Sequence, residues 1–138
     1  MKNPKELFLE YLVNIKDIDR VVDLFAEDAV IEIPYLESIN IPSRNEGKEG
    51  VRAFINFVFS TMPDFKFENI VVHMETEDQA FVEYHANALV PATGKYYNQH
   101  FFGRLVAENG KIKLISESLN PVISARAMFP NGTGGIPA

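Results

Sequence analysis

The chain has 138 residues, of which 46% are hydrophobic and 23% charged, so a single globular domain over 1–138 is expected and disorder is excluded. Its net charge of −6, with no basic run, argues against nucleic acid and anionic membranes as partners. The absence of cysteine excludes disulfides, thiol catalysis and cysteine-ligated zinc, and the start lacks the apolar segment of a signal peptide, so a cytoplasmic protein is expected.

Two helices and a short strand are predicted in the first third of the chain. Apolar residues at helical spacing indicate a first helix over 7–15. A second short helix is expected to begin after Asp17, a good N-cap residue, and to carry Phe25. Alternation of apolar and polar residues then predicts a strand at 29–33.

The remainder of the chain changes from helical to strand periodicity. Residues 35–47 are expected to form a loop, and the strongest helical pattern of the chain, over 51–62, predicts a helix that ends at Pro63. Four strands follow, at 65–74, 81–90, 95–107 and 111–119. This order favours an α+β domain with helices against an antiparallel sheet. The Gly- and Pro-rich residues 130–138 are expected to form a flexible or partner-draped tail.

Three segments carry a family resemblance, the third of them in two parts. They read LFAEDAV at 24–30, GKEGVR at 47–52, NGKI at 109–112 and ESLNP at 117–121. In this order and spacing they resemble the NTF2-like, or ketosteroid-isomerase-like, superfamily and its SnoaL-like branch, which contains polyketide cyclases. The resemblance implies a cone, in which a strongly bent antiparallel sheet wraps around three N-terminal helices and leaves a conical pocket.

The carboxyl half is most similar to the phenazine-biosynthesis A/B proteins of that branch. The similarity rests on GKYYNQHF at 94–101, ENGKIK at 108–113 and GIP at 135–137. It implies a homodimer that acts on a small cyclic ketone–amine intermediate. A Glu and a Tyr of that family fall on Glu117 and Tyr97 of this chain.

Other functional positions of these relatives hold apolar residues here. The helix His of the phenazine proteins falls on Phe54, their helix Ser on Val58, and the basic Asp of the isomerases on Ile33. The Arg that reaches over from a partner subunit would fall on Val21, and the predicted strand 95–107 lacks the Asp of the cyclases. The resemblance therefore implies the scaffold without the standard catalytic residues.

Glu117 is the first candidate for chemistry. It alternates with Ile115 and Leu119, which places its carboxylate on an apolar face of the last strand. Desolvation there would raise the pKa of the carboxyl toward neutrality, where it can act as a general acid or base. The alternative is a carboxylate at the sheet edge, solvated or paired with Arg104 or Lys113.

The turn at 108–110 decides whether Tyr97 shares the face of Glu117. A two-residue turn pairs Glu117 with Phe102 and places Tyr97 on the opposite face. A three-residue loop pairs Glu117 with Phe101 and brings Tyr97 to the same face. The family resemblance favours the three-residue loop, with an ordinary sheet aromatic as the alternative role for Tyr97.

Polar residues near these two are assigned by the same register. Gln99 is expected in the pocket as a neutral group that orients a carbonyl, whereas His100 faces the other way and is left out of the site. His85 shares a face with Glu83, and that face either lines the pocket or lies on the outer surface. His73 is expected at the surface.

The rest of the expected pocket is apolar. Phe54 on the long helix, together with Phe101 and Leu119, is expected to contact the ligand. The three histidines fall on separate strands and no glycine-rich loop joins a strand to a helix, so neither a metal nor another cofactor is expected.

These residues favour a cofactor-free acid–base enzyme of isomerase, cyclase or condensation type for a small cyclic carbonyl-bearing metabolite. One alternative is a non-catalytic protein that binds a small apolar or cyclic molecule in the same pocket. Another is a structural role, with the pocket filled by side chains. A homodimer is expected because the outer sheet face carries Tyr96 and Phe102.

Overall fold

A six-stranded sheet is the framework of the computed structural model, which describes residues 1–137. The strands are β1 (Phe25–Glu32), β2 (Arg44–Glu46), β3 (Phe67–Glu75), β4 (Gln79–Val90), β5 (Lys95–Glu108) and β6 (Lys111–Ser118). The helices are α1 (Pro4–Val13), α2 (Ile18–Val22), α3 (Gly47–Thr61) and α4 (Pro121–Met128), with short 3-10 helices η1 (Pro34–Ile39) and η2 (Gly132–Gly135).

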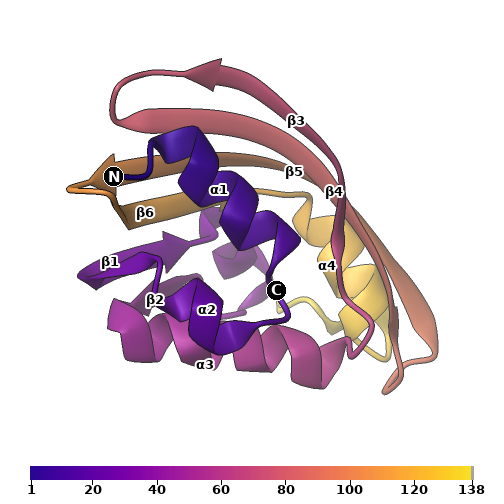
Figure 1. Cartoon of the computed structure of the whole chain (residues 1–138). Helices are drawn as coiled ribbons and strands as arrows, with labels where there is room; N and C mark the ends of the chain where they lie inside the picture. Colours follow the sequence, from indigo (N-terminus) through magenta and orange to yellow (C-terminus); the bar gives the residue numbers. More distant parts are fainter. Residues whose placement is uncertain (138) are drawn as a thin grey trace.

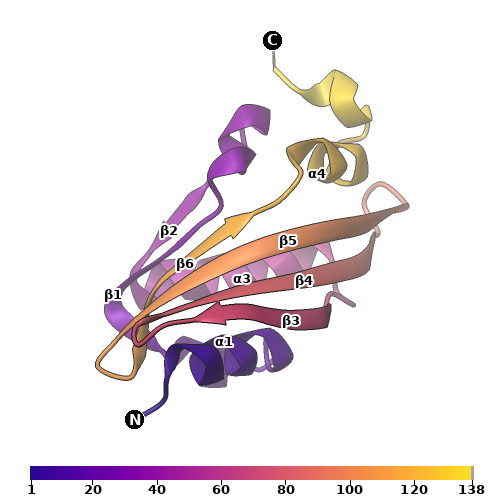
Figure 2. The same cartoon turned by 90° about the horizontal axis from the view of Figure 1, so that it is seen from above.

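The sheet is strongly curved, and its strands lie in the order β2-β1-β6-β5-β4-β3. Helices α1 and α3 lie on the concave side and α4 closes one end, whereas no helix of residues 1–137 covers the outer face of β4 and β5 (Figures 1 and 2). This arrangement confirms the predicted α+β class and the bent sheet around N-terminal helices. The sheet is mixed rather than wholly antiparallel, because β1 pairs with β6 in parallel.

The first half of the chain departs from the prediction at the start of β1 and within the expected loop 35–47. Phe25 does not belong to the second helix: α2 ends at Val22, and Phe25 is the first residue of β1, paired with Ile112 of β6. Phe25 is fully buried, so burial against the sheet decides its place rather than its helical spacing from α2. The expected loop 35–47 contains most of η1 and all of β2.

The four predicted strands of the second half are confirmed with small shifts of their ends. Helix α4 was not predicted; Asn120 caps it by accepting a hydrogen bond from the Val122 amide, and Pro121 occupies its first turn. In the expected tail, η2 forms and Ile136 packs against the core, while Ala138 lies outside the described residues.

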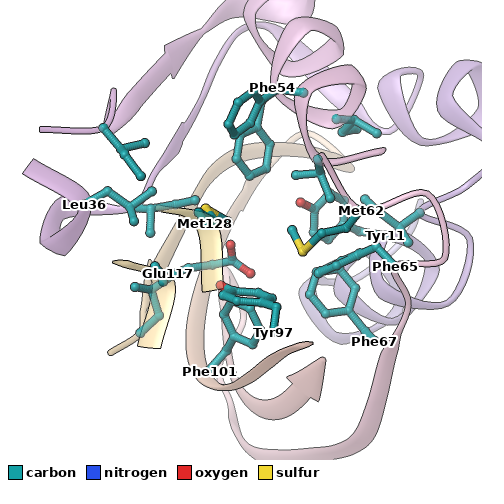
Figure 3. A pocket seen from close by; sticks show the side chains of 18 residues that line it. Tyr11, Leu36, Phe54, Met62, Phe65, Phe67, Tyr97, Phe101, Glu117 and Met128 are labelled. Atoms are coloured by element: carbon teal, nitrogen blue, oxygen red, sulfur yellow. The ribbon is translucent and has the colours of Figure 1, made fainter. Parts of the chain in front are cut away.

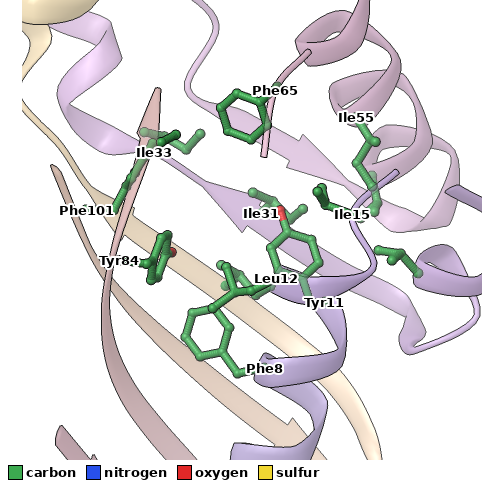
Figure 4. Close-up of a cluster of buried hydrophobic side chains, with 14 of the residues drawn as sticks. Phe8, Tyr11, Leu12, Ile15, Ile31, Ile33, Ile55, Phe65, Tyr84 and Phe101 are labelled. Atoms are coloured by element: carbon green, nitrogen blue, oxygen red, sulfur yellow. The ribbon is translucent and has the colours of Figure 1, made fainter. Parts of the chain in front are cut away.

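The core fills the space between the concave face and the helices (Figure 4). Leu7, Phe8, Tyr11 and Leu12 of α1 are buried, as their helical spacing predicts. Each fully buried side chain of this size contributes about 1.5–3 kcal/mol. Helix α3 buries only Val51 and Ile55 completely, so the rest of its apolar stripe is free to line a cavity.

None of the helices in residues 1–137 is both long and apolar enough to span a membrane.

Candidate active site

A cavity of about 60 Å³ lies between α3 and the concave face of the sheet (Figure 3). Eighteen residues from α1, η1, α3, β3, β5, β6, α4 and adjoining segments line it. Oxygen atoms of lining side chains come only from Tyr11, Tyr97, Glu117 and Ser124, and no Lys, Arg or His is among the eighteen. The cavity is therefore apolar, with a few polar groups placed at its wall.

The β5–β6 register differs from both predicted registers. The turn is the two-residue one: Glu108 pairs with Lys111, and Asn109 and Gly110 have φ of 53° and 73°. Ala107 keeps this register by pairing with Ile112, but Val106 pairs with Leu114, so the strand partners shift by one residue at a bulge.

This bulge sets the face of the candidate residues. It pairs Glu117 with Gly103 rather than with Phe101 or Phe102. Because side chains alternate along a strand, residues 97, 99, 101 and 103 share one face with Glu117. The expected shared face of Tyr97 and Glu117 therefore forms, although the three-residue loop that was expected to produce it does not.

Glu117 is buried in the cavity wall. Its side chain is 2% exposed, and its Oε2 accepts a hydrogen bond from the hydroxyl of Tyr84 on β4. Burial raises the pKa of Glu117 to about 7, and the hydrogen bond from Tyr84 acts in the opposite direction. A carboxyl that exchanges its proton near neutral pH can serve as a general acid or base.

Tyr84 keeps its proton at neutral pH. It is fully buried, and burial, followed by the charge of Glu117, raises its pKa well above the ordinary value. It therefore acts as a donor that holds the Glu117 carboxyl in place.

Tyr11 offers a free hydroxyl to the cavity. Its side chain on α1 is fully buried, and its oxygen has no hydrogen-bond partner within residues 1–137. Burial, and then the charge of Glu117, raises its pKa well above the ordinary value, so Tyr11 remains a donor at neutral pH. An unsatisfied buried hydroxyl costs about 1–3 kcal/mol, and a ligand oxygen would recover it.

Tyr97 also lines the cavity, where Figure 3 shows it beside Glu117. Burial raises the pKa of Tyr97 to about 12, although the nearby side chains of Ser124 and Gln99 act in the opposite direction. Tyr97 is thus a second neutral hydroxyl on the wall that holds the carboxyl.

Gln99 does not line the cavity, which corrects its expected role there. Its Nε2 donates to the Asn120 carbonyl at 3.0 Å, and its Oε1 accepts from the Asn120 amide at 3.1 Å. A further contact joins Nε2 to the Ser124 hydroxyl at 3.3 Å. The amide of Gln99 therefore fastens the start of α4 to β5 and is not free to orient a ligand.

His85 lies on the outer face of the sheet, so it does not belong to the cavity lining. Its ring stacks on that of His100 with centroids 4.2 Å apart, and His100 faces outward as predicted. Glu83 joins the same surface, with its carboxylate oxygens 2.6 Å from His100 Nε2 and 2.7 Å from His73 Nε2.

The three expected apolar contacts, Phe54, Phe101 and Leu119, all line the cavity. Their part in binding a substrate remains a prediction. Within residues 1–137, no group of three or more His, Asp or Glu side chains is arranged to hold a metal ion.

Two residues of the site were missed in the sequence. Tyr11 reads as one more member of the apolar stripe of α1, and Tyr84 as one aromatic on a strand. A usable signal for Tyr84 was its alternation with Val82 and Ala86, because two small apolar neighbours on one face indicate that this face is buried.

The chain belongs to the SnoaL-like domain family, which it matches over residues 6–115. The resemblance inferred from the sequence motifs is thereby confirmed at the level of the branch. No curated protein matches the chain significantly.

Solved structures with the same fold include a phenazine biosynthesis-related protein, a proposed isomerase and a proposed polyketide cyclase. A phenazine biosynthesis-related protein from Pseudomonas aeruginosa is 25% identical, with a TM-score of 0.76 over 97% of this chain and 86% of that chain. A proposed isomerase from Bacillus subtilis is 22% identical, with a TM-score of 0.76 over 91% of both chains. A proposed polyketide cyclase from Pseudomonas putida KT2440 is 18% identical, with a TM-score of 0.79 over 93% of this chain and 99% of that chain.

Proposed function

We propose that the protein is a cofactor-free acid–base enzyme of isomerase, cyclase or condensation type that acts on a small cyclic carbonyl-bearing metabolite. The observation that carries this proposal is the buried carboxyl of Glu117, whose pKa burial raises to about 7, in an apolar cavity with an unpartnered Tyr11 hydroxyl. Such a carboxyl is costly to bury, and proton transfer gives it a reason to be there. Neighbours of the same fold that carry proposed isomerase and cyclase assignments support this class.

The proposed reaction begins with removal of a proton from the carbon next to the carbonyl. Glu117, as the carboxylate, takes that proton, and the electron pair of the C–H bond moves to the carbonyl oxygen to form an enolate. The hydroxyls of Tyr11 and Tyr97, which both line the cavity, donate to this oxygen, where negative charge develops. Where a C=C bond adjoins the deprotonated carbon, the protonated Glu117 then returns the proton to the far carbon of that bond as the carbonyl re-forms, so the double bond moves next to the carbonyl and the isomerisation is complete.

The lining must move to admit a ring. An engineered cavity of about 150 Å³ holds benzene, and the present cavity has about 60 Å³. Met62 and Met128 line it, and their unbranched side chains can rotate at little cost. Phe57, another lining residue, is half exposed and lies on the solvent side of the wall.

Hydrogen–deuterium exchange tests the proposal without knowledge of the natural substrate. The protein is incubated in D₂O with a panel of small cyclic ketones, and exchange at the carbon next to the carbonyl is followed by NMR. Exchange above the buffer rate is expected for the wild type and should disappear in Glu117→Gln. Glu77→Gln, in the exposed turn between β3 and β4, is the matched control and should exchange as the wild type does. If Glu117→Gln exchanges the ketones as fast as the wild type, Glu117 is not the group that transfers the proton.

A non-catalytic binding protein is the second candidate. The hydrogen bond from Tyr84 favours it, because that bond holds the carboxyl in one place and partly offsets the cost of its burial. A ketone that binds saturably, with no exchange above the buffer rate for any member of the panel, would support this candidate.

We further propose that the protein is a homodimer that uses the outer face of β3, β4 and β5. Tyr96 and Phe102 are exposed there, and Phe102 stacks on Phe81 with centroids 6.0 Å apart. Glu83 lies between His73 and His100 at the centre of this face. Two copies of an acidic protein can approach here with little repulsion between like charges.

A further inference from the structure

The cavity is surrounded by aromatic rings and holds a single ionisable carboxyl. Of its eighteen lining residues, seven are aromatic, and two more, Met62 and Met128, bring polarisable sulfur. Figure 3 shows the carboxyl of Glu117 directed toward the middle of this lining. Because the faces of aromatic rings carry partial negative charge, this lining can attract a cation, which a purely aliphatic lining cannot do.

No positive charge on the protein balances Glu117. The lining contains no Lys, Arg or His, and no salt bridge within residues 1–137 includes Glu117. The only hydrogen bond from the described residues to its carboxyl is the one from Tyr84 to Oε2. As a carboxylate, Glu117 would therefore be a buried charge without a counter-ion, which is unfavourable unless a ligand supplies one.

A small organic cation matches both the aromatic lining of this cavity and its carboxyl without a counter-ion. Its charge pairs with the carboxylate, and its methyl groups rest on the faces of the rings, as in aromatic cages that bind quaternary ammonium groups. A carboxylate or phosphate ligand has the opposite effect, because it meets Glu117 with no cationic side chain to neutralise either charge.

We propose that this cavity binds small alkylammonium groups of the trimethylammonium type, paired with the carboxylate of Glu117 and enclosed by the lining aromatic rings. The inference rests on the cavity and the carboxyl used in the proposed function, but not on the catalytic step. It adds a ligand class that the acid–base reaction does not require.

Binding of a cation and binding of a neutral ketone depend on pH in opposite directions. The cation pairs with the carboxylate, so its affinity rises with pH and levels off above the pKa of Glu117, which burial raises to about 7. A neutral ketone held by hydrogen bonds gains a donor when Glu117 is protonated, so its affinity does not rise with pH. The other polar groups that face Glu117 or line the cavity are Tyr84, Tyr11, Tyr97 and Ser124, and burial raises the pKa of each of the three tyrosines, so all four are neutral in this range.

Choline and its neutral isostere 3,3-dimethylbutan-1-ol form the matched pair of probes, and the methyl signals of Met62 and Met128 report binding by NMR. Choline is expected to bind the wild type at least about tenfold more tightly than the alcohol at pH 8. Its dissociation constant is expected to rise about tenfold from pH 8 to pH 6, because Glu117 takes up a proton in this range. The alcohol should show no such dependence, and in Glu117→Gln the dissociation constant of choline should no longer depend on pH.

Equal affinity for the two probes, a choline affinity that does not fall at pH 6, or no saturable choline binding at pH 8 would overturn the inference. If Glu117→Gln does not fold, the pH dependence in the wild type still decides. Ketone exchange that persists while choline fails to bind would refute only this inference. Choline binding without ketone exchange would refute only the proposed enzyme activity.

Discussion

Gly103 lies directly opposite Glu117 across the β5–β6 pair, and its missing side chain leaves the space through which Tyr84 reaches the Glu117 carboxyl. A Cβ atom at Gly103 would lie 2.3 Å from the Tyr84 hydroxyl oxygen and 2.7 Å from the ring of Phe8. Both distances are far below van der Waals contact, so no side chain fits unless the network moves. The position of the carboxyl therefore depends on a glycine that itself bears no polar group.

Gly103→Ala tests this dependence. The new methyl group should displace Tyr84 or Phe8 and lower the free energy of unfolding by about 1–3 kcal/mol, as overpacking in a core does. Urea denaturation followed by circular dichroism gives the value. Gly134→Ala is the matched control, because its Cβ would meet only an ordinary contact at 3.7 Å; a change within about 0.5 kcal/mol is expected there. Equal stability of the two variants would contradict the tight packing at Gly103.

Tyr84→Phe removes the hydrogen bond to Glu117 and leaves the ring in place. Because that bond lowers the pKa of Glu117, its loss should raise the pKa above about 7. The pH at which ketone exchange reaches half its maximum should move upward by the same amount. Tyr96→Phe, on the exposed outer face, is the control and should leave the midpoint unchanged. A midpoint that stays in place or falls in Tyr84→Phe would show that Tyr84 does not favour the carboxylate.

The stability of the fold should depend on pH through Glu117. Its pKa is raised from 4.5 to about 7 in the folded protein, so between these values the folded state binds a proton that the unfolded state does not. The contribution of Glu117 to the free energy of unfolding is therefore fully present below pH 4.5. It is lost as pH rises through 7, which lowers the free energy of unfolding by about 3 kcal/mol. Urea denaturation at pH 5 and pH 8 measures it.

Glu117→Gln isolates this contribution, because every other titrating group is common to both proteins. In the variant, the free energy of unfolding should not show the fall between pH 5 and pH 8 that Glu117 causes in the wild type. Relative to the wild type, the variant should therefore be more stable at pH 8 than at pH 5. Parallel pH profiles for the two proteins would mean that Glu117 titrates alike in the folded and unfolded states.

The proposed homodimer can be checked by light scattering at micromolar concentration. Phe102→Glu places a charge on the outer sheet face and should give a monomer, since burying an unpaired carboxylate in an interface is costly. Val13→Glu, at the exposed end of α1, is the control and should leave the mass unchanged. A monomeric wild type would argue against the dimer altogether.

Local sequence patterns predicted most of this fold. The helical stripes of α1 and α3 and the alternation in β3 to β6 are each encoded in consecutive residues, and these elements formed as expected. Helix α4 was missed, because its eight residues carry little periodicity and the Asn120 cap was not recognised. Phe25 was misplaced, because its burial against β6 is a contact with a segment distant in sequence.

The candidate site was predictable only in part, for the same reason. Alternation sufficed to place Glu117 on an apolar face, but the register of β5 against β6 depends on a bulge that no turn motif encodes. The partners of the carboxyl come from other elements: Tyr84 from β4 and Tyr11 from α1. Alternation assigned Gln99 to the pocket face, but its amide is occupied by hydrogen bonds to Asn120, a partner that strand periodicity does not reveal.

The titration of the Glu117 carboxyl carbon by ¹³C NMR tests the central claim most directly. The signal is identified by its loss in Glu117→Gln, and its chemical shift is followed from pH 4 to pH 9. A midpoint at about 7 is expected, because burial in the cavity disfavours the charged form. A midpoint near 4.5 would place an ordinary, charged carboxylate there at neutral pH, and would contradict a group poised for both acid and base chemistry.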